Sequence, residues 1–374
     1  MSASQGISAA ALAGISLRKT MARAQDSDIG EGVALEREQN ARLRAVDLES
    51  WYGKELEPFT FRTVFVPLTQ DEARGVMAGY SARQAEEQGK EGVALTEAQR
   101  QSLVGLREKI AAGISELGAG DAGVFAKLSS RSPKDSRYCE ARAFRMVVER
   151  LSLQLKEAGG AVQPNDIVRA VMGCGIAALR LCTAEEVLDC FLTSDRVCED
   201  DIPLALSFPH KWSQHIVLRE WVDIPTEGEF RAFVFDGELT AVSQYFVGAY
   251  FEGLVQQQAR VQALIRSFFD TIRPLIQVSP AEYVLDLAVD MSTERVYVIE
   301  LNPFGKPDGL GTGTCLFKKN DPADLAVLFG ESPFQFRVQT APLTDISHLL
   351  REGPLRSWLL SNGVIKLWPI DAGH

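Results

Sequence analysis

The 374-residue sequence lacks several features that would assign it to a class of protein directly. Its six cysteines include no CxxC pair and follow no secretory leader, so neither a zinc site nor a disulfide framework is indicated. We expect reduced, mostly buried thiols in an intracellular protein. The apolar runs are far shorter than the roughly 20 residues that a membrane helix needs. The sequence therefore predicts a soluble, cytoplasmic protein with no membrane partner.

Positive charge is also scarce over the chain as a whole. The formal net charge is −11, whereas a protein that coats nucleic acid is normally basic. No RRM or KH signature and no internal repeat is present. One local run is nevertheless cationic, and it could meet an anionic ligand or be a solvated loop and helix face. Its members are Lys127, Arg131, Lys134, Arg137, Arg142, Arg145 and Arg150.

A hydrophobic fraction of 46% is enough for a substantial core, and the length allows two or more packed units. The N-terminal stretch carries Arg18, Lys19 and Arg23 and faintly resembles an organelle transit peptide. A disordered leader is the preferred interpretation. We expect four segments: residues 1–50 as a leader that is largely disordered or helical, residues 51–215 and 216–342 as two α+β units, and residues 343–374 as a C-terminal helical extension.

Two helix starts carry the residue pairs of a capping box. Thr96 and Gln99 open the first helix, apolar residues recur at helical spacing after them, and Gly118 can end it. Thr183 and Glu186 open the second. Two more helices are expected from their apolar faces, over residues 254–272 and from residue 343 into the tail.

β-Branched and aromatic residues predict strands in FTFRTVFVPL, after Gly120, in IVLREWV, and in EFRAFVF and ELTAVSQYF. Asp236 and Gly237 join the last two runs, which is a strong signal for a two-residue hairpin. The glycine-rich segment 305–314 predicts a flexible loop that could close over a ligand.

A further hairpin, centred on position 293, is predicted by the runs AEYVLDLAVD and RVYVIELNPFG. In that register Asp286 and Glu300 lie opposite each other, and facing like charges are destabilising unless something neutralises them. Two carboxylates and the amide oxygen of Asn302 leave part of an octahedral shell for phosphate oxygens and water, as is usual for Mg2+ at a nucleotide triphosphate. The pattern therefore predicts a magnesium site formed by these three residues.

Simpler interpretations of the same residues stay open. A register one residue off would leave both acids merely solvated. Asn302 precedes a proline and could be an ordinary turn residue.

Longer motifs resemble a known family over roughly residues 51–317. They are FAKLSSRSPKDS, TAEEVLDCFLTSDRV, VLREWVDIPTEGEFRAFVFDGELTAVSQY and VIELNPFG. Their order is similar to that of the ATP-grasp fold, and more narrowly to that of the cell division cycle protein 123 family. The resemblance implies an α+β, ATP-grasp fold in which two α+β subdomains hold Mg-ATP between them.

The resemblance also implies roles for individual residues. Lys127 would reach the ATP phosphates, and the following loop, with Ser132 and Lys134, would cover them. Arg231 would contact phosphate as well. The adenine hinge would be formed by Arg219, Glu220, Trp221 and Val222.

Alternatives to these roles remain. Lys127 could be a surface lysine whose stem packs on the protein, and Trp221 could be plain core. Arg231 alternates with buried aromatic residues and so needs an anionic partner, which could be Glu229 or Asp286 instead of a phosphate.

Two functions follow from the resemblance. The first is an ATP-dependent ligase, in which Lys127, Lys134 and Arg231 act catalytically and an RNA end or a carboxylate is the acceptor. It is favoured because Glu300 stands where family members have Asp, and the E-x-N form is that of catalytic ATP-grasp ligases. The alternative is the role known for the family, an ATP-bound chaperone that assembles eukaryotic translation initiation factor 2 by docking its γ subunit.

Overall fold

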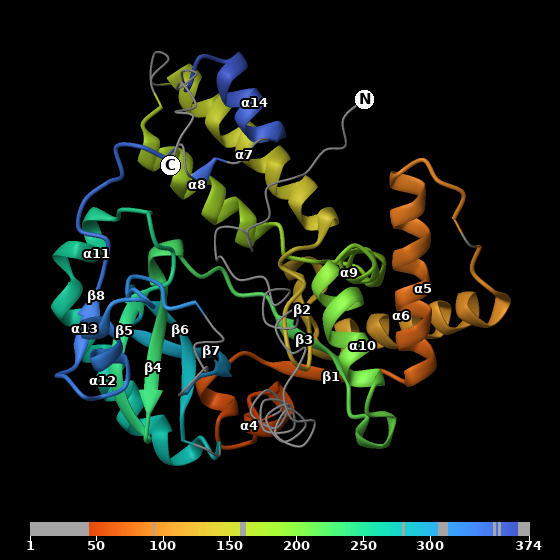
Figure 1. The fold of residues 1–374 in the computed structure, drawn as a ribbon, viewed down its shortest axis with the longest axis horizontal. Coiled ribbons are helices and arrows are strands. Elements are labelled where there is room, and N and C mark those ends of the chain that lie inside the picture. The colour runs from red at the N-terminus through yellow and green to blue at the C-terminus, as the bar shows by residue number, and fades with distance from the viewer. Residues whose placement is uncertain are drawn as a thin grey trace, which may run out of the picture.

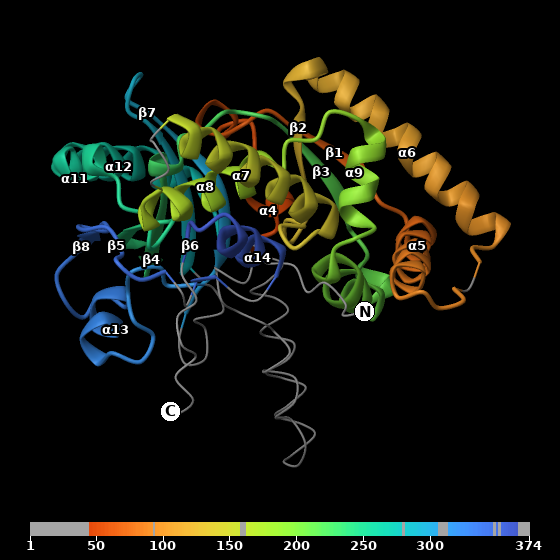
Figure 2. The same ribbon diagram turned by 90° about the horizontal axis from the view of Figure 1, so that it is seen from above.

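The computed structural model describes residues 45–365, except residue 93 and residues 158–161, 279–280, 306–312, 347–348 and 351–352. Within these residues the fold is a mixed α+β arrangement of two sheets with helices around them (Figure 1 and Figure 2). The smaller sheet has the strand order β1-β3-β2, and the larger has the order β7-β6-β4-β5-β8. The predicted α+β class is therefore confirmed.

The smaller sheet consists of β1 (Thr63–Pro67), β2 (Val124–Leu128) and β3 (His215–Glu220). The central strand, β3, is antiparallel to both neighbours. The sequence placed most of β3 in the second unit, beyond a boundary at residue 215. In the structure its hydrogen bonds assign it to the first sheet, because β1 and β2 both precede that boundary.

Two long helices, α5 (Gln70–Glu87) and α6 (Glu97–Leu117), pack beside the smaller sheet. The predicted start of α6 is confirmed, because Thr96 and Gln99 form both hydrogen bonds of a capping box. Gly118 ends the helix in the left-handed conformation, with φ 61°.

The middle of the chain is helical. One predicted cap is only half formed there: the Thr183 hydroxyl accepts from the Glu186 amide, but the Glu186 carboxylate accepts from the Cys182 amide and not from that of Thr183. The segment comprises α7 (Arg137–Glu157), α8 (Pro164–Ala177), α9 (Ala184–Phe191), a π-helical turn over Arg196–Asp201, and α10 (Ile202–Leu206).

The larger sheet is antiparallel except at its edge, where β8 runs parallel to β5. The predicted hairpin between β4 and β5 is confirmed, with positive φ angles at Asp236 (51°) and Gly237 (71°). Its strands are β4 (Glu229–Phe235), β5 (Glu238–Gln244), β6 (Tyr283–Asp290), β7 (Arg295–Pro303) and β8 (Gln335–Arg337).

The long helix predicted after β5 is divided into α11 (Glu252–Gln256) and α12 (Gln258–Ile272), because Gln257 leaves the helical conformation with φ −100° and ψ 9°. The helix predicted from residue 343 is also wrong in extent. α14 spans only Pro354–Ser361, since Gly353 and Pro354 interrupt the pattern and proline favours the first helical turn. Between α12 and α14 along the chain lies α13 (Pro322–Leu328).

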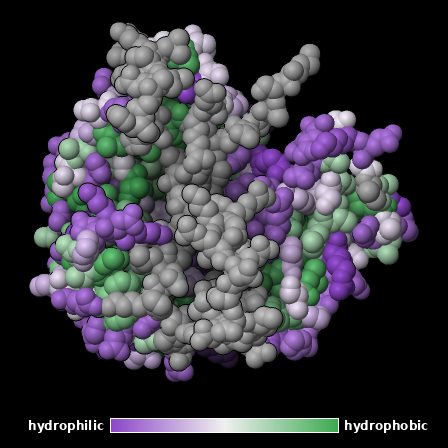
Figure 3. Space-filling view, in the orientation of Figure 1, coloured by the Kyte–Doolittle hydropathy of each residue, from purple (hydrophilic) through white to green (hydrophobic). Residues whose placement is uncertain are grey.

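The main core joins the larger sheet to α7, α8 and α14, and Figure 1 shows these three helices together on one side of the molecule. Leu48 and Trp51 of α4 (Leu48–Trp51) also belong to this core. On the face drawn in Figure 3, hydrophilic residues gather at the end of the molecule formed by α5. No helix within the described ranges is both long and apolar enough to cross a membrane.

Candidate functional site

A buried ion pair connects the two sheets. Lys127 lies on β2, and its Nζ donates to Oε2 of Glu300 on β7 at 3.1 Å. The two side chains are only 2% and 14% exposed. Burying a charge is costly unless it is paired, so each side chain stabilises the other at this position. The alternative that Lys127 is a surface lysine is therefore wrong.

A second buried ion pair lies beside it within the larger sheet. Arg231 on β4 donates from Nε to Oδ1 of Asp286 at 2.7 Å and from Nη2 to Oδ2 at 2.6 Å, which is a bidentate contact. The Asn302 amide nitrogen donates to the same Oδ2 at 3.0 Å. Burial lowers the pKa of Arg231, but the Asp286 carboxylate more than offsets this and raises it. Asp286 is thus the anionic partner that Arg231 was expected to need.

The predicted register of the acids is confirmed, since Asp286 and Glu300 are directly paired across β6 and β7. The ladder then shifts, because Leu287 pairs with Val298 and leaves Ile299 as the extra residue of a bulge. In the structure the two facing carboxylates are neutralised by Arg231 and Lys127.

Arg219 on β3 contacts the bulged residue, Ile299. This β3 residue is 2% exposed, donates to the carbonyl oxygen of Ile299 and to the Thr60 hydroxyl, and lies 4.9 Å from the centroid of the Phe61 ring. Burial lowers the pKa of Arg219 to about 10. Its side chain therefore ties β3 to β7, and its predicted contact with adenine stays a prediction.

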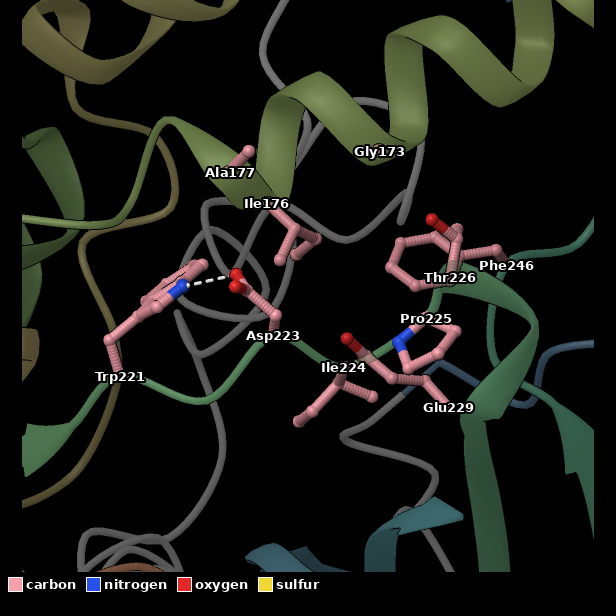
Figure 4. Close-up of a pocket in the computed structure, with 10 residues that line it drawn as sticks. All are labelled: Gly173, Ile176, Ala177, Trp221, Asp223, Ile224, Pro225, Thr226, Glu229 and Phe246. Atoms are coloured by element: carbon pink, nitrogen blue, oxygen red, sulfur yellow. Dashed lines mark hydrogen bonds between the residues drawn. The ribbon is translucent and has the colours of Figure 1, made fainter. Parts of the chain in front are cut away.

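The rest of the predicted hinge lies at the surface or at a cavity. Glu220 accepts from Nε of Arg62 at 2.7 Å, and Val222 is 38% exposed. Trp221 lines a cavity of about 250 Å³, and its Nε1 donates to Oδ1 of Asp223 at 2.7 Å, which fixes the ring (Figure 4). The ring also packs on the core of the smaller sheet, so Trp221 is partly core, and its predicted place beside adenine stays a prediction.

The cavity lies between α8 and the segment that leads from β3 into β4 (Figure 4). Most of its lining residues are apolar, and the Glu229 side chain extends from the start of β4 toward the middle of the group, near Ile224 and Pro225 (Figure 4). The lining residues also include Gly173, Ile176, Ala177, Thr226 and Phe246.

Lys134 reaches the charged cluster from the Ser129–Ser136 loop, which joins β2 to α7. Its Nζ donates to the Tyr245 hydroxyl at 3.3 Å and lies 5.3 Å from the centre of that ring. Burial lowers the pKa of Lys134, but Tyr245 and three neighbouring acids outweigh this effect and raise it. Lys134 is therefore charged at neutral pH. Ser132, in the same loop, is buried.

The acids of the cluster have opposite pKa shifts. Burial would raise the pKa of Glu300, but Lys127 and Lys134 reverse this and lower it to about 2. Burial raises the pKa of Glu229 to about 7, and nearby Lys134 only partly opposes the rise. Glu229 is thus only partly ionised at neutral pH. Within the described residues, the cluster has more positive than negative charge, from Lys127, Lys134, Arg219 and Arg231 against Asp286, Glu300 and Glu229.

Acids on the π-helical turn hold the Ser129–Ser136 loop in place. Arg131 donates from Nε to Oδ1 of Asp201 at 2.9 Å and from Nη2 to Oδ2 of Asp200 at 3.2 Å. The Ser130 hydroxyl donates to Asp201 at 2.9 Å. Much of the predicted cationic run is paired in the same way, because Arg137 contacts two acids. Such pairing leaves less positive charge for an RNA than the sequence suggested.

Three residues of the site were not predicted to act there. Glu229 was considered only as a partner of Arg231, and Tyr245 and Asp223 were not considered. Glu229 did carry a signal, because an acid at the start of an otherwise apolar strand needs a reason to be buried. The α8 wall of the cavity carried no such signal, since α8 ends 38 positions before β3 begins and only the fold brings them together.

Comparison with known proteins identifies relatives of this chain. The model of the D123 family matches residues 178–328. A translation initiation factor eIF2 assembly protein of Danio rerio is 34% identical over 110 residues, which cover 29% of either chain. The protein of the same name from Schizosaccharomyces pombe is 29% identical over 181 residues, covering 44% of this chain and 55% of the relative. The alignments thus span about a third to a half of these relatives' lengths.

The fold has relatives among solved structures. The structure of Cdc123 from Schizosaccharomyces pombe is similar with a TM-score of 0.51 and 19% identity, over 80% of this chain and 97% of that one. At this identity the likeness concerns the fold alone. Together these findings confirm the resemblance that the sequence motifs indicated: this chain is related to the D123 family and to the proteins named eIF2 assembly protein and Cdc123.

Proposed function

We propose that this chain binds Mg-ATP between its two sheets, as an ATP-grasp protein, and in that form assists the assembly of a translation initiation factor 2 complex. The observation that carries the nucleotide part is the excess of buried positive charge at the sheet junction. An anion with several charges would balance it, and burying unbalanced charge without one is costly.

The cavity beside the cluster supports a nucleotide over a simple anion. Its volume of about 250 Å³ lies just below the usual range of roughly 300–1,000 Å³ for ligand pockets, which suits one base. Ile176, Ile224 and Phe246 offer apolar surface for the base, and Glu229 both lines the cavity and interacts electrostatically with Lys134 of the cluster. The base would occupy the cavity and the phosphates the cluster.

Lys127, Lys134 and Arg231 are the residues that would bind the phosphates. Each is held by a partner that a phosphate can replace: Glu300, the Tyr245 hydroxyl and Asp286. Lysine acts as a compact point charge, and arginine offers a planar fork of donors. On binding Mg-ATP, the protein would therefore replace these internal contacts with contacts to the phosphates.

Magnesium would be held by Asp286, Glu300 and Asn302. No group of three or more His, Cys, Asp or Glu side chains in the described part of the chain could hold a metal. The donor set still fits magnesium on a nucleotide, because that ion keeps water and phosphate ligands and needs only one or two carboxylates. Asn302 now directs its amide nitrogen at Asp286, and a half-turn of the amide would present its oxygen. When bound, the ion neutralises phosphate charge.

The assembly role is supported by the names of the relatives, which are eIF2 assembly proteins. We propose the γ subunit of initiation factor 2 as the partner and the cytoplasm as the location. In this proposal ATP is bound and need not be consumed.

Calorimetry of the purified chain with Mg-ATP tests the nucleotide part. The paired variant Lys127→Met/Glu300→Gln removes one charge of each sign and should abolish binding while keeping the fold. The exposed Lys90→Met is the control and should bind normally. Absence of binding by the wild type would refute the proposal. Pull-down of the initiation factor's γ subunit with and without Mg-ATP tests the partner.

The second candidate is an ATP-dependent ligase, favoured by the placement of Glu300 opposite Asp286 and two residues before Asn302. Incubation with radiolabelled ATP and either RNA ends or carboxylate acceptors separates the two functions. Transfer of label by the wild type, lost in Glu300→Gln, would establish the ligase. Binding without turnover, together with capture of the γ subunit, would establish the assembly factor.

A further inference from the structure

Two buried cysteines are in contact beneath the Ser129–Ser136 loop. Cys139 lies in the first turn of α7 and Cys190 near the end of α9, and their Sγ atoms are 3.4 Å apart. Their exposed fractions are 3% and 0%. Because the S–S bond of a disulfide is about 2.05 Å long, the sulfur atoms would need to approach by little more than 1 Å.

The two thiols differ in chemistry. Cys139 lies at a helix N-terminus, which favours a thiolate. The hydrogen bond from Cys190 lowers the pKa of the Cys139 thiol against the effect of burial, and Ser136 adds to the lowering. The same bond, together with burial, raises the pKa of Cys190. Cys139 is therefore the nucleophile of the pair, and Cys190 is the thiol that can resolve it.

We propose that Cys139 and Cys190 are a redox modification site, which hydrogen peroxide converts reversibly into a disulfide. The Cys139 thiolate attacks one peroxide oxygen, the O–O bond breaks, and the departing hydroxide takes a proton to become water. The Cys190 sulfur then attacks the sulfenic acid on Cys139, the S–S bond forms, and the hydroxyl group leaves as water with the thiol proton. Two thiols are oxidised, and the peroxide is reduced to two waters.

The thiol pair lies directly under the loop that carries Lys134. The Pro133 carbonyl oxygen is 4.0 Å from Sγ of Cys190, and the Ser136 hydroxyl accepts from the Cys139 amide at 3.4 Å. The loop covers the sulfurs on this side, so we expect peroxide to reach them when the loop opens. If the proposed nucleotide function holds, bound Mg-ATP keeps the loop on the phosphates and slows the oxidation.

Peptide mapping of the full chain tests the proposal. Reduced protein is treated with hydrogen peroxide, alkylated and digested, and a Cys139–Cys190 linked peptide is expected that dithiothreitol removes. Cys139→Ser and Cys190→Ser should each abolish it. Cys182→Ser, which changes a partly exposed cysteine nearby, is the matched control and should retain it. Mapping the wild type needs no variant, so the test holds if a serine variant fails to fold.

The outcomes are distinct. Oxidation of Cys182 or Cys315 without any linked peptide would overturn the proposal. Mg-ATP at about ten times its Kd should slow the reaction roughly tenfold, because the ligand suppresses opening of the loop in proportion to its occupancy. An unchanged rate with binding confirmed by calorimetry would overturn the link to the loop. If calorimetry shows no nucleotide binding, the proposed function fails, while a linked peptide still supports the disulfide.

Discussion

Arg131 and Lys134 lie three residues apart in one loop, yet their surroundings differ. Arg131 faces two carboxylates, those of Asp200 and Asp201. Lys134 contacts the neutral hydroxyl and ring of Tyr245. The first cation is neutralised within the fold, whereas the second adds to the positive excess at the sheet junction.

One loop can therefore be both anchored and available to a ligand. A phosphate would have to displace two acids from Arg131. In the proposed complex it displaces a single acid from Lys127 or Arg231, and that acid passes to magnesium. Lys134 contacts an uncharged phenol, so it loses little interaction energy when it turns to a phosphate. The loop is therefore held at Arg131 and directs Lys134 at the ligand.

The largest loss of stability is expected from breaking the ion pair of Lys127 and Glu300, which joins the two sheets. Lys134 also stabilises the Glu300 charge. Lys127→Met leaves Glu300 buried with one cation fewer, and breaking a buried pair costs about 3–5 kcal/mol. Denaturant unfolding should show this loss in the free energy of unfolding. Lys127→Met/Glu300→Gln should recover most of it. Equal stability of the single variant and the wild type would mean that the pair contributes nothing.

A pH-dependent effect is expected at Glu229, whose charge lies near Lys134. Its pKa is about 7 in the folded chain and 4.5 ordinarily, so the unfolded chain loses this proton first and stability falls as pH rises between those values. Glu229→Gln should stabilise the protein at pH 8 by on the order of 3 kcal/mol, and this gain should vanish below pH 4.5. A gain that does not depend on pH would contradict the assignment.

Lys134→Met probes the available cation of the loop. Loss of a charged hydrogen bond to phosphate, roughly 1.5–3 kcal/mol, should weaken Mg-ATP binding about 10–100-fold in calorimetry. The melting temperature should fall less than in Lys127→Met, because Lys134 directly contacts the uncharged Tyr245 hydroxyl and interacts with the neighbouring acids without a hydrogen bond to them. Normal affinity in this variant would reverse the distinction between the two cations.

Arg131→Met probes the anchoring cation and should have the smallest effect on nucleotide binding. Asp200 is 41% exposed but Asp201 only 10%, so the loss of stability should lie between the roughly 1 kcal/mol of a surface pair and the roughly 3 kcal/mol of a buried one. Nucleotide affinity should fall less than in Lys134→Met, since the variant only loosens the loop. A larger fall than in Lys134→Met would show that Arg131 is the ligand contact.

Local features of the fold were predictable from the sequence. The capping box of α6 depends on Thr96 and Gln99 alone, and the facing of Asp286 and Glu300 follows from strand periodicity and a short turn. The prediction of one continuous helix from residue 343 was wrong, because the apolar pattern was given more weight than the break at Gly353 and Pro354.

Features that depend on contacts distant in sequence were less predictable. The sequence did not decide whether Arg231 pairs with an acid or with a phosphate, because strand register alone does not show which anion reaches the guanidinium. The cavity needs α8 to lie against the segment after β3, and no local pattern encodes that contact. The sequence did not show that the cationic run is paired within the fold, because a partner such as Asp201 lies about 70 positions away from Arg131.

The central place of β3 has a consequence for how this chain can be divided. The segment that matches the D123 model begins at residue 178, yet both neighbours of β3 come from before it. Excised at that point, the segment would carry a strand with two bare edges, which invites pairing with other chains and aggregation. The stretch that is recognisable by similarity is therefore not a module that can be expressed or transplanted alone, and truncations intended to preserve the fold must retain β1 and β2.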